Sequence, residues 1–485
     1  MNLYYFAALW IFLLSGCNVG PRYVSPDFPA PSAFKESSPA VYNEAPPGTW
    51  QPALPQDAAL KGKWWEIFNE PELNTLEDQL NIDNQNIAQY FQNFMAGRAQ
   101  VSEARAGYFP TVGVNPVFSR TEGGIGATTG TSSTSTGKTT TDFSLPFDVS
   151  WEPDLWDRVR NTVREYQYAA QVSAADLENE RLTEQADLAE YYFELRGQDA
   201  LQDLYNRTIK ADRQSLDLTR ALVETGIDGQ EAVAEAEVTL EGAEAAGIGV
   251  ATNRALYEHA IATLIGKPAS TFSMPVKLLN TPVPAVPVGI PSELLQRRPD
   301  IAAAERTMAQ ANALIGVEKA AYYPTLSLTG SGGFESSTIA KLISGPAFFW
   351  SLGAAAAETI FDAGLRNATV VQYTAAYNAD ASSYKETVLT AFQQVEDYIA
   401  TLRVLSEQIA RQNAAVKAAQ RYVNIAQAQY QTGLDPYLNV LTAQTILLSD
   451  QQTLVTLRVS EMMAAVQLVQ ALGGGWDVTQ INNTP

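Results

Sequence analysis

The pattern of apolar and polar residues changes its period twice along the chain. Over residues 83–108 and again over 299–322, apolar residues recur at the spacing of a helix. After Pro110 and after Pro324, apolar and polar residues alternate instead, as in a strand with two different faces. Both changes follow an aromatic pair and begin with Pro-Thr. The sequence therefore predicts the same helix-to-strand unit twice.

The alternating segments predict four strands. The stretches FSLPFDVSW (143–151) and FFWSLGAAAA (348–357) each have one apolar face, and PTVGVN and PTLSLTG begin their partner strands. Alternation over about ten residues per segment is typical of a membrane β-barrel, but a half-buried soluble hairpin has the same pattern. Pro116 and Pro146 lie within these segments. Because proline donates no ladder hydrogen bond, they predict bulges or different strand boundaries.

The number of strands limits what one chain can build. A barrel needs about eight strands to close. An open sheet edge is not tolerated in lipid, because its backbone N–H and C=O groups have no partners there. If these strands lie in a membrane, several chains must contribute to one barrel.

Two helical runs are far longer than an ordinary globular helix. They extend over 157–225 and 365–432, which is about 100 Å each at 1.5 Å per residue. Their many charges exclude a membrane span, and narrow seams of small apolar residues favour close packing against neighbouring helices. Each run ends in Thr-Gly-x-Asp. The glycine is predicted to adopt a left-handed conformation, and the aspartate, Asp228 or Asp435, to cap the shorter helix that follows.

The N-terminus contains the apolar run LYYFAALWIFLLSG, which is too short to span a bilayer but has the length of a signal-peptide core. The next residue, Cys17, is the one cysteine of the chain. Leu-Ser-Gly-Cys resembles the lipobox of bacterial lipoproteins, in which the cysteine receives a diacylglycerol and an N-acyl chain. Residues 1–16 lack the usual Lys or Arg, so an ordinary secretory signal is the alternative.

The same motifs recur in the same order roughly 200 residues apart, which predicts a duplicated unit. The expected organisation is a lipoprotein signal peptide (1–16), an extended segment with equatorial elements (17–80), repeat 1 (81–265), a Pro-rich linker (266–291), repeat 2 (292–473) and a C-terminal tail (474–485). Each repeat comprises a helix, a β-hairpin, a long helix and a shorter helix.

Composition and charge restrict the function. The net charge of −21 argues against a nucleic-acid partner. The one histidine, His259, is expected on a helix face in a structural role. There is no Cys/His cluster and no G-x-S-x-G motif, and TGKTT lacks the earlier glycine of a phosphate loop, with Ser132 in its place. We expect no enzyme activity, no metal and no cofactor other than the lipid on Cys17.

Four further motifs carry a resemblance to a known family. They are GCNVGPRY (16–23), KWWEIFNEPELNTL (63–76), LLQRRPDIAAAE (294–305) and YYPTLSLTG (322–330). With the two Thr-Gly-x-Asp turns, the sequence resembles the outer membrane factor family of TolC-like efflux channels. Within that family it is similar to the lipoprotein branch of the OprM and NodT type.

The resemblance implies a mixed membrane protein that forms a homotrimer. Three chains with four strands each would form a twelve-stranded transmembrane β-barrel in the outer membrane, continued by a long periplasmic α-helical barrel. The channel would be a passive exit duct for small molecules. Its partners would be a periplasmic adaptor and an inner-membrane transporter of the resistance-nodulation-division type. The alternatives are an exit channel for type I protein secretion, or a coiled-coil envelope lipoprotein that forms no channel.

The resemblance also implies a gate at the periplasmic helical tips, formed by rings of side chains after the second turn. The matching residues are Leu438, Asn439 and Thr442. Since Thr442 stands where relatives commonly carry aspartate, Glu231 and Glu235 after the first turn are expected to supply the acidic charge. The residues expected to contact the adaptor are Thr225, Gly226, Asp228, Thr432, Gly433 and Asp435.

Overall fold

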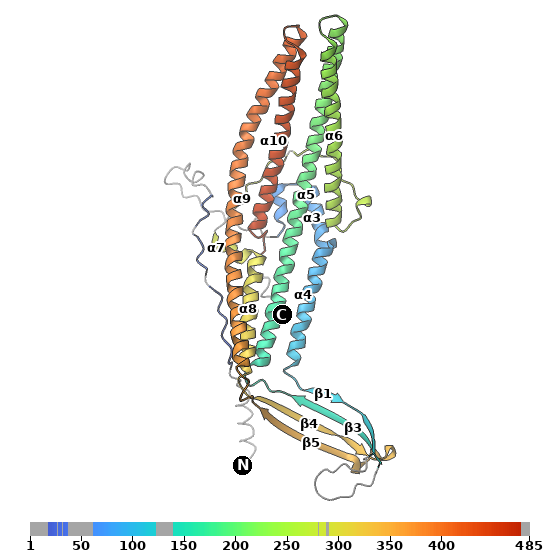
Figure 1. Ribbon diagram of the computed structural model, residues 1–485, viewed down its shortest axis with the longest axis vertical. Coiled ribbons are helices and arrows are strands. Elements are labelled where there is room, and N and C mark those ends of the chain that lie inside the picture. Colours follow the sequence, from blue (N-terminus) through green and yellow to red (C-terminus); the bar gives the residue numbers. More distant parts are fainter. Residues whose placement is uncertain are drawn as a thin grey trace. The chain divides into compact units, whose positions relative to one another are not determined.

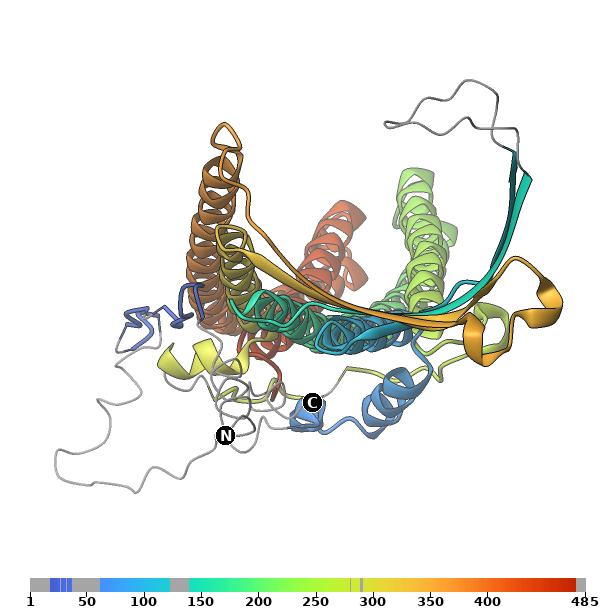
Figure 2. The ribbon, with the colours of Figure 1, turned by 90° about the horizontal axis from the view of Figure 1, so that it is seen from below.

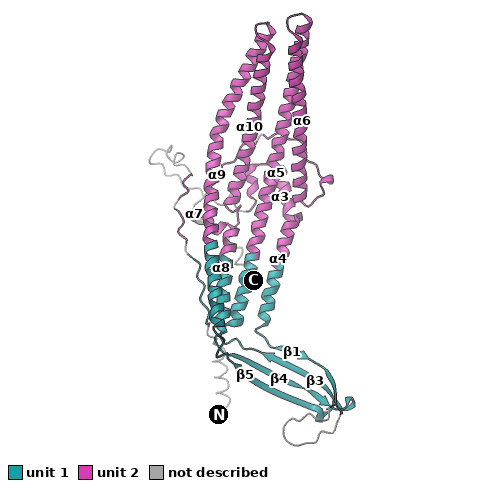
Figure 3. Ribbon diagram, viewed as in Figure 1, with its two compact units in different colours: residues 1–26, 95–172, 305–383 teal, residues 27–94, 173–304, 384–485 magenta. Residues whose placement is uncertain are grey.

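The computed structural model describes residues 18–26, 28–31, 33–36, 62–122, 139–279, 281–287 and 291–476. The chain divides into two compact units (Figure 3). Unit 1 takes its described residues from 1–26, 95–172 and 305–383, and unit 2 takes them from 27–94, 173–304 and 384–485. Each unit therefore contains segments from both halves of the sequence.

Helices make up most of the described chain (Figure 1). The long runs predicted from the sequence are single helices, and α5 and α9 have 67 residues each. The helices that follow them, α6 and α10, have 35 residues each. Within the described ranges, none of the helices combines the length and the apolar character needed to cross a membrane. The α-helices are α3 (Pro71–Asp83), α4 (Gln85–Ala106), α5 (Arg158–Glu224), α6 (Gln230–Leu264), α7 (Pro291–Arg297), α8 (Pro299–Ala320), α9 (Leu365–Gln431) and α10 (Tyr437–Ala471).

The described strands form one antiparallel sheet in unit 1. They are β1 (Thr111–Val114), β2 (Val117–Glu122), β3 (Thr139–Trp151), β4 (Thr325–Ser336) and β5 (Phe348–Ala357). The order is β1-β3-β4-β5, and β2 also pairs with β3. Figure 2 shows that the sheet curves along its strands instead of lying flat. The first of the four expected strands is thus divided in two.

Two prolines explain the division. Pro116 lies between β1 and β2, as expected of a residue that cannot donate to a ladder. The expectation of a bulge or a boundary at Pro146 is wrong, because Pro146 lies inside β3 and pairs with Gly333 of β4. The Pro146 carbonyl accepts a hydrogen bond from the Asn115 amide (3.4 Å). Because the nitrogen and the oxygen of one strand residue face the same neighbouring strand, the position of the absent N–H also faces the break between β1 and β2. The ladder to β4 therefore loses nothing.

One face of the sheet is apolar and the other is polar. Residues that pair directly across two strands lie on the same face. On the polar face, the Ser331 hydroxyl donates to Asp148 over 2.7 Å. The apolar face remains largely uncovered, since Trp350 is 69% exposed and Leu352 is 81% exposed. The register gathers on this face Val112, Val114, Phe118, Phe143, Phe147, Val149, Phe334, Phe348, Trp350 and Leu352.

The core of unit 2 is built around the aromatic residues of a short 3-10 helix, η2 (Trp64–Phe68). Trp64 and Phe68 are completely buried. Phe68 packs on Phe193 of α5 with ring centroids 5.1 Å apart, and the Trp64 indole N–H donates to Gln185 over 3.1 Å. The long helix α9 contributes residues spaced three and four apart, as predicted for a narrow seam. In α9, the buried residues are Tyr384, Val388, Ala391, Val395, Ile399, Ala419, Val423, Ala426 and Tyr430.

Gly197 allows α5 and α10 to approach each other closely. It is the one glycine in α5, where glycine costs helix stability. A Cβ atom at this position would lie 2.5 Å from Cγ2 of Val459 on α10, which is shorter than any ordinary contact. The close packing of α5 against α10 therefore explains why glycine occupies position 197.

Asp199 fixes part of the Pro-rich linker to the helices of unit 2. Its side chain is 1% exposed and accepts hydrogen bonds from Arg196 (3.0 Å) and Arg254 (2.7 Å). It also accepts a bond from the backbone amide of Lys277 (3.0 Å) in the linker. Because buried charges require paired partners, this network holds an otherwise extended segment against α5 and α6.

Candidate functional site: the paired helical turns

The turns after α5 and α9 have the same backbone geometry. Gly226 has φ +76° and Gly433 has φ +71°, a left-handed conformation that favours glycine. In both turns the amide of the following residue, Ile227 or Leu434, bonds back to a carbonyl in the last turn of the helix over 3.0 Å. This is the Schellman arrangement, which ends a helix by satisfying its last carbonyls. The sequence predicted the role of both glycines.

The two turns lie close together within unit 2. A Cβ atom on Gly433 would lie 3.8 Å from Cγ2 of Ile227. Tyr430, in the last turn of α9, donates a hydrogen bond over 2.7 Å to the carboxylate of Asp228. The α5–α6 hairpin and the α9–α10 hairpin are therefore joined at their turns.

The prediction that Asp228 and Asp435 cap the shorter helices is wrong. The N-cap residues are Gly229 for α6 and Pro436 for α10, and neither makes a side-chain cap hydrogen bond. Each shorter helix begins one residue later than it would if the aspartate were its N-cap. Asp228 instead accepts the Gly229 amide (2.8 Å) and the Tyr430 hydroxyl.

A small apolar core fills the space between the four helices near the turns. The rings of Tyr430 and Tyr437 pack with their centroids 5.3 Å apart. Burial raises the pKa of Tyr430 to about 12 and also raises the pKa of Tyr437, so both hydroxyls stay neutral at physiological pH. The core consists of Leu216, Ala232, Ala236, Leu240, Val423, Ala426, Tyr430, Tyr437, Val440 and Ala443.

The five gate candidates lie outside this core. Leu438 is 53% exposed, Thr442 and Glu231 are exposed, and Asn439 and Glu235 are half-buried. The Thr442 hydroxyl donates to the Leu438 carbonyl over 2.8 Å. Within the described part of the chain, no hydrogen bond or ion pair joins the two glutamates to the three α10 residues. The exposed side chains of Leu438, Thr442 and Glu231 therefore have surface available for contacts outside their own chain.

The six adaptor-contact candidates form the surface of the two turns. Thr225, Gly226, Thr432 and Gly433 are exposed, and the two aspartates, Asp228 and Asp435, are half-buried.

Sequence reasoning missed Tyr430 and Tyr437, which the structure brings to the centre of the tip. The signal for them is weak, since they differ from other tyrosines only in flanking the second turn in YQTGLDPY.

Other predicted positions are not part of this site. Cys17 and residues 1–16 lie outside the described residues. His259 is exposed on α6. Across the described ranges, no three His, Cys, Asp or Glu side chains gather as a group that could hold a metal ion.

Comparison with known families identifies the chain. The family model described as outer membrane efflux protein matches residues 76–267 and 290–474. The chain belongs to the outer membrane efflux protein family. This efflux protein is located in the outer membrane, and it is a channel protein of efflux transport.

Relatives of this efflux protein match over nearly its whole length. It is 31% identical over 473 residues to the antibiotic efflux pump outer membrane protein ArpC of Pseudomonas putida, covering 97% of this chain and 95% of the relative. It is 27% identical over 455 residues to nodulation protein T of Rhizobium leguminosarum bv. trifolii, covering 93% and 92%.

Solved structures of outer-membrane channels share the fold. The efflux protein matches OprN with a TM-score of 0.84 at 25% identity, over 95% of this chain and all of OprN. It matches the open state of the MtrE channel of Neisseria gonorrhoeae with a TM-score of 0.80 at 25% identity, over 95% of this chain and 99% of MtrE.

Proposed function

We propose that three copies of this efflux protein form one outer-membrane channel, which is the exit duct for small molecules in a tripartite efflux pump. The observation that carries the proposal is the sheet of unit 1, which exposes one continuous apolar face and has two open edges. Lipid is the natural partner of such a face, and open edges must pair before a sheet is stable in lipid.

The sheet also supports the number of copies. Four strand positions per chain are too few for a closed barrel, and three chains supply twelve. In this arrangement β5 of one copy pairs with the β1–β2 strand of the next. The polar face, with Asp148 and Ser331, then lines the water-filled interior.

The long helices continue the channel as a periplasmic barrel. Each copy contributes α5, α6, α9 and α10, so a trimer has twelve helices. Apolar side chains that are exposed in a single copy support contacts between copies, because helices of this length need neighbours along both sides. Three examples are Val238 (74% exposed), Ile248 (75%) and Ile425 (57%).

The division of each chain into two internal repeats belongs to the same proposal. The equal lengths of α5 and α9, and of α6 and α10, support repeats at 81–265 and 292–473. The family model that matches two separate stretches also supports them. The proposal divides the rest of the chain into a signal peptide (1–16), an extended segment with equatorial elements (17–80), a Pro-rich linker (266–291) and a C-terminal tail (474–485).

A lipid anchor completes the attachment to the membrane. After removal of residues 1–16, Cys17 carries a diacylglycerol and an N-acyl chain. Two or more acyl chains give stable anchoring, whereas one chain binds only marginally.

The paired turns are the proposed gate and docking surface. Rings of Leu438, Asn439 and Thr442 from three copies narrow the duct, and Glu231 and Glu235 make the constriction acidic. A periplasmic adaptor contacts the surface of the two turns, and an inner-membrane transporter of the resistance-nodulation-division type supplies the energy. The adaptor surface comprises Thr225, Gly226, Asp228, Thr432, Gly433 and Asp435.

The names of the relatives favour efflux over the two alternatives. ArpC is named for antibiotic efflux, and other relatives from Pseudomonas putida are named for toluene and solvent efflux. Export of proteins by a type I system and a coiled-coil lipoprotein without a channel are less well supported. As a passive duct, the chain itself performs no chemical reaction.

The test combines a physical and a cellular measurement. The purified protein is expected to be trimeric and to open conducting pores in planar bilayers. A strain without the gene is expected to become more susceptible to drugs and to recover with the gene restored. A monomeric protein that does not conduct, or a deletion without any change in susceptibility, would contradict the proposal.

A further inference from the structure

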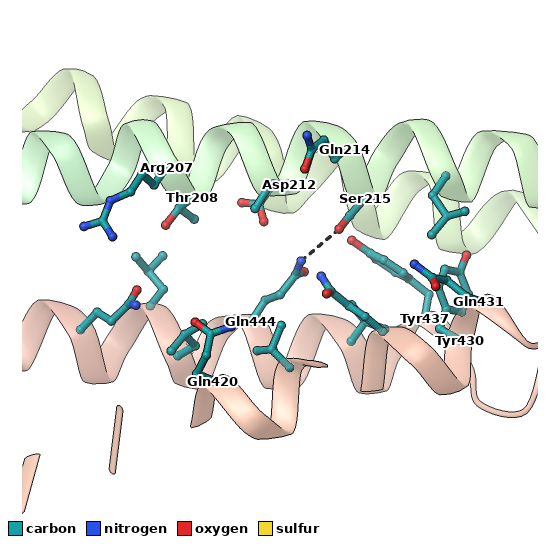
Figure 4. Close-up of a pocket in the computed structure, with 18 of the residues that line it drawn as sticks. Arg207, Thr208, Asp212, Gln214, Ser215, Gln420, Tyr430, Gln431, Tyr437 and Gln444 are labelled. Carbon is teal, nitrogen blue, oxygen red and sulfur yellow. Dashed lines mark hydrogen bonds between the residues drawn. The ribbon is translucent and has the colours of Figure 1, made fainter. Parts of the chain in front are cut away.

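A cavity of about 400 Å³ lies in unit 2 between α5 and the α9–α10 hairpin (Figure 4). Its polar wall includes Asp212 and Ser215 from α5 and Gln444 and Tyr437 from α10. Figure 4 shows Asp212 directed from α5 into the space between the helices, with Gln444 reaching toward α5 from the other side. This volume is within the range of small-molecule sites.

Two acceptor atoms of residues that line this cavity lack donors. Asp212 is 2% exposed, and among the described residues its Oδ2 atom has no hydrogen-bond partner. The Oε1 atom of Gln444 is also buried without a partner, although its amide nitrogen donates to the Ser215 hydroxyl over 3.0 Å. Buried polar atoms are nearly always paired, so two unpaired acceptors in one cavity indicate a missing donor.

The charges around the cavity do not neutralise Asp212. The cation in the lining, Arg207 of α5, is 66% exposed and forms an ion pair with Asp203 (3.0 Å). On α9 and α10, Tyr430 and Tyr437 stay neutral because burial raises their pKa. From α6, the negatively charged Glu235 adds to the effect of burial in raising the pKa of the Tyr437 hydroxyl. The missing donor is therefore expected to carry positive charge.

We propose that this cavity binds a small organic amine as its ammonium ion, with the ammonium group donating to Asp212 and Gln444. An ammonium group has three N–H donors, which suit two acceptor oxygens on opposite walls. The tyrosine rings of the cavity attract a cation. A hydrocarbon chain on the amine finds apolar contacts with Leu218, Val440 and Leu447. A bare metal ion would make no use of the apolar wall.

Titration of Asp212 gives the binding a defined pH dependence. Burial raises the pKa of Asp212 to about 6. Below that pH the carboxyl group is neutral and loses its attraction for a cation, whereas an alkylamine stays protonated at and above that pH. Binding is therefore stronger at pH 7 than at pH 5. The proposal does not rest on channel formation, since binding is measured on the solubilised protein.

The test is isothermal titration of the full chain in detergent micelles with n-butylammonium chloride, in about 0.15 M KCl so that ordinary monovalent cations already compete. Asp212→Asn is expected to weaken binding about tenfold or more, because a charge-assisted hydrogen bond is lost. It is also expected to remove the difference between pH 5 and pH 7. The matched control is Asp217→Asn, which changes an exposed aspartate of the same helix.

Partitioning of the probe into micelles is the same for every variant and cancels in the comparison. Asp212→Asn is nearly isosteric and removes a buried charge, so the variant is expected to fold. A second variant, Gln444→Met, is expected to weaken binding several-fold. Three results would overturn the proposal: no binding by the unchanged protein, equal binding by Asp212→Asn, or equal binding of uncharged n-butanol.

Discussion

The hydroxyl group of Tyr430 lies 2.7 Å from the Oδ2 atom of Asp228 and donates a hydrogen bond to it. Tyr430 belongs to the last turn of α9, and Asp228 belongs to the turn between α5 and α6. The tyrosine side chain is 4% exposed, so the bond forms at the edge of the small core near the turns. The two hairpins cannot separate at their turns without breaking it.

Tyr430→Phe is expected to favour opening of the channel. The substitution keeps the ring in the core and removes the hydrogen bond to the charged Asp228, which contributes about 1.5–3 kcal/mol, together with the longer contact to the Thr219 hydroxyl (3.2 Å). The measurement is the open probability in planar bilayers, with Tyr422→Phe as the control because Tyr422 is 41% exposed on the same helix. Since the pKa of Tyr430 is about 12, the unchanged protein should show no effect of this group between about pH 7 and 9. Equal opening of the two variants would show that this bond does not hold the gate.

Removing the charges of Glu231 and Glu235 is expected to reduce cation preference. In the proposed trimer these two residues supply the acidic charge of the constriction, and rings of carboxylates select cations in narrow pores. The double substitution Glu231→Gln and Glu235→Gln should lower the cation-to-anion permeability ratio in single-channel recordings. Glu241→Gln, an exposed glutamate of α6, is the control. If cation preference and opening stay unchanged in the double variant, the acidic constriction is not formed by these residues.

A charge on the apolar face of the sheet is expected to block membrane insertion. Leu352 lies on that face in the middle of β5, where arginine at mid-membrane depth costs about 2–4 kcal/mol. Its neighbour Ser351 lies on the polar face. Leu352→Arg should therefore reduce the amount of assembled protein in outer-membrane fractions, and Ser351→Arg should not. The reverse result, or equal loss, would contradict the assignment of the lipid-facing side.

Gly197→Ala is expected to destabilise unit 2, although alanine favours a helix by about 1 kcal/mol over glycine. The added Cβ atom would overlap with Val459, and overpacking of this kind typically costs about 1–3 kcal/mol. Val459→Ala removes the overlapping methyl groups, so the double variant should recover part of the loss in a thermal unfolding experiment. If the destabilising effects of the two substitutions simply add, close packing against Val459 is not the reason for the glycine at position 197.

Glu77→Gln is expected to stabilise the protein at neutral pH. Glu77 is fully buried in α3, and neither of its carboxylate oxygens has a hydrogen-bond partner among the described residues. Burial raises its pKa well above the ordinary value. Below about pH 4 the group is protonated in both the folded and the unfolded chain. As the pH rises, the unfolded chain ionises first, and the folded protein loses about 1.4 kcal/mol for each unit of pKa difference.

The melting temperature of Glu77→Gln should therefore exceed that of the unchanged protein at pH 7, and the difference should shrink toward pH 4. Glu66→Gln is the control, because Glu66 is exposed. A difference between the two proteins that is the same at both pH values would show that the carboxyl group does not titrate as its burial implies.

Local periodicity was sufficient to predict the long helices and the strand segments of this protein. The helical runs predicted at 157–225 and 365–432 are α5 (Arg158–Glu224) and α9 (Leu365–Gln431). Long segments with an uninterrupted pattern end where Gly226 and Gly433 leave the helical conformation, and both signals are local. Pro146 shows the limit of local rules, because whether a missing donor matters depends on which neighbouring strand it faces.

The candidate site was predicted only in its position along the chain. The Thr-Gly-x-Asp motifs located the turns, but they gave Asp228 a capping role that the structure does not bear out. Its partner Tyr430 is about 200 residues away in sequence, and no local pattern distinguishes it from the other tyrosines.

By itself, the sequence determined the helices of the two repeats, the strand segments and the two faces of each strand, because these depend on the spacing of apolar residues along a short length of chain. Only the tertiary structure decided which side chains meet across helices: Tyr430 with Asp228, Gly197 with Val459, and Asp212 with a cavity. The reason is that such contacts depend on the register between helices. That register follows from the packing of all their side chains together.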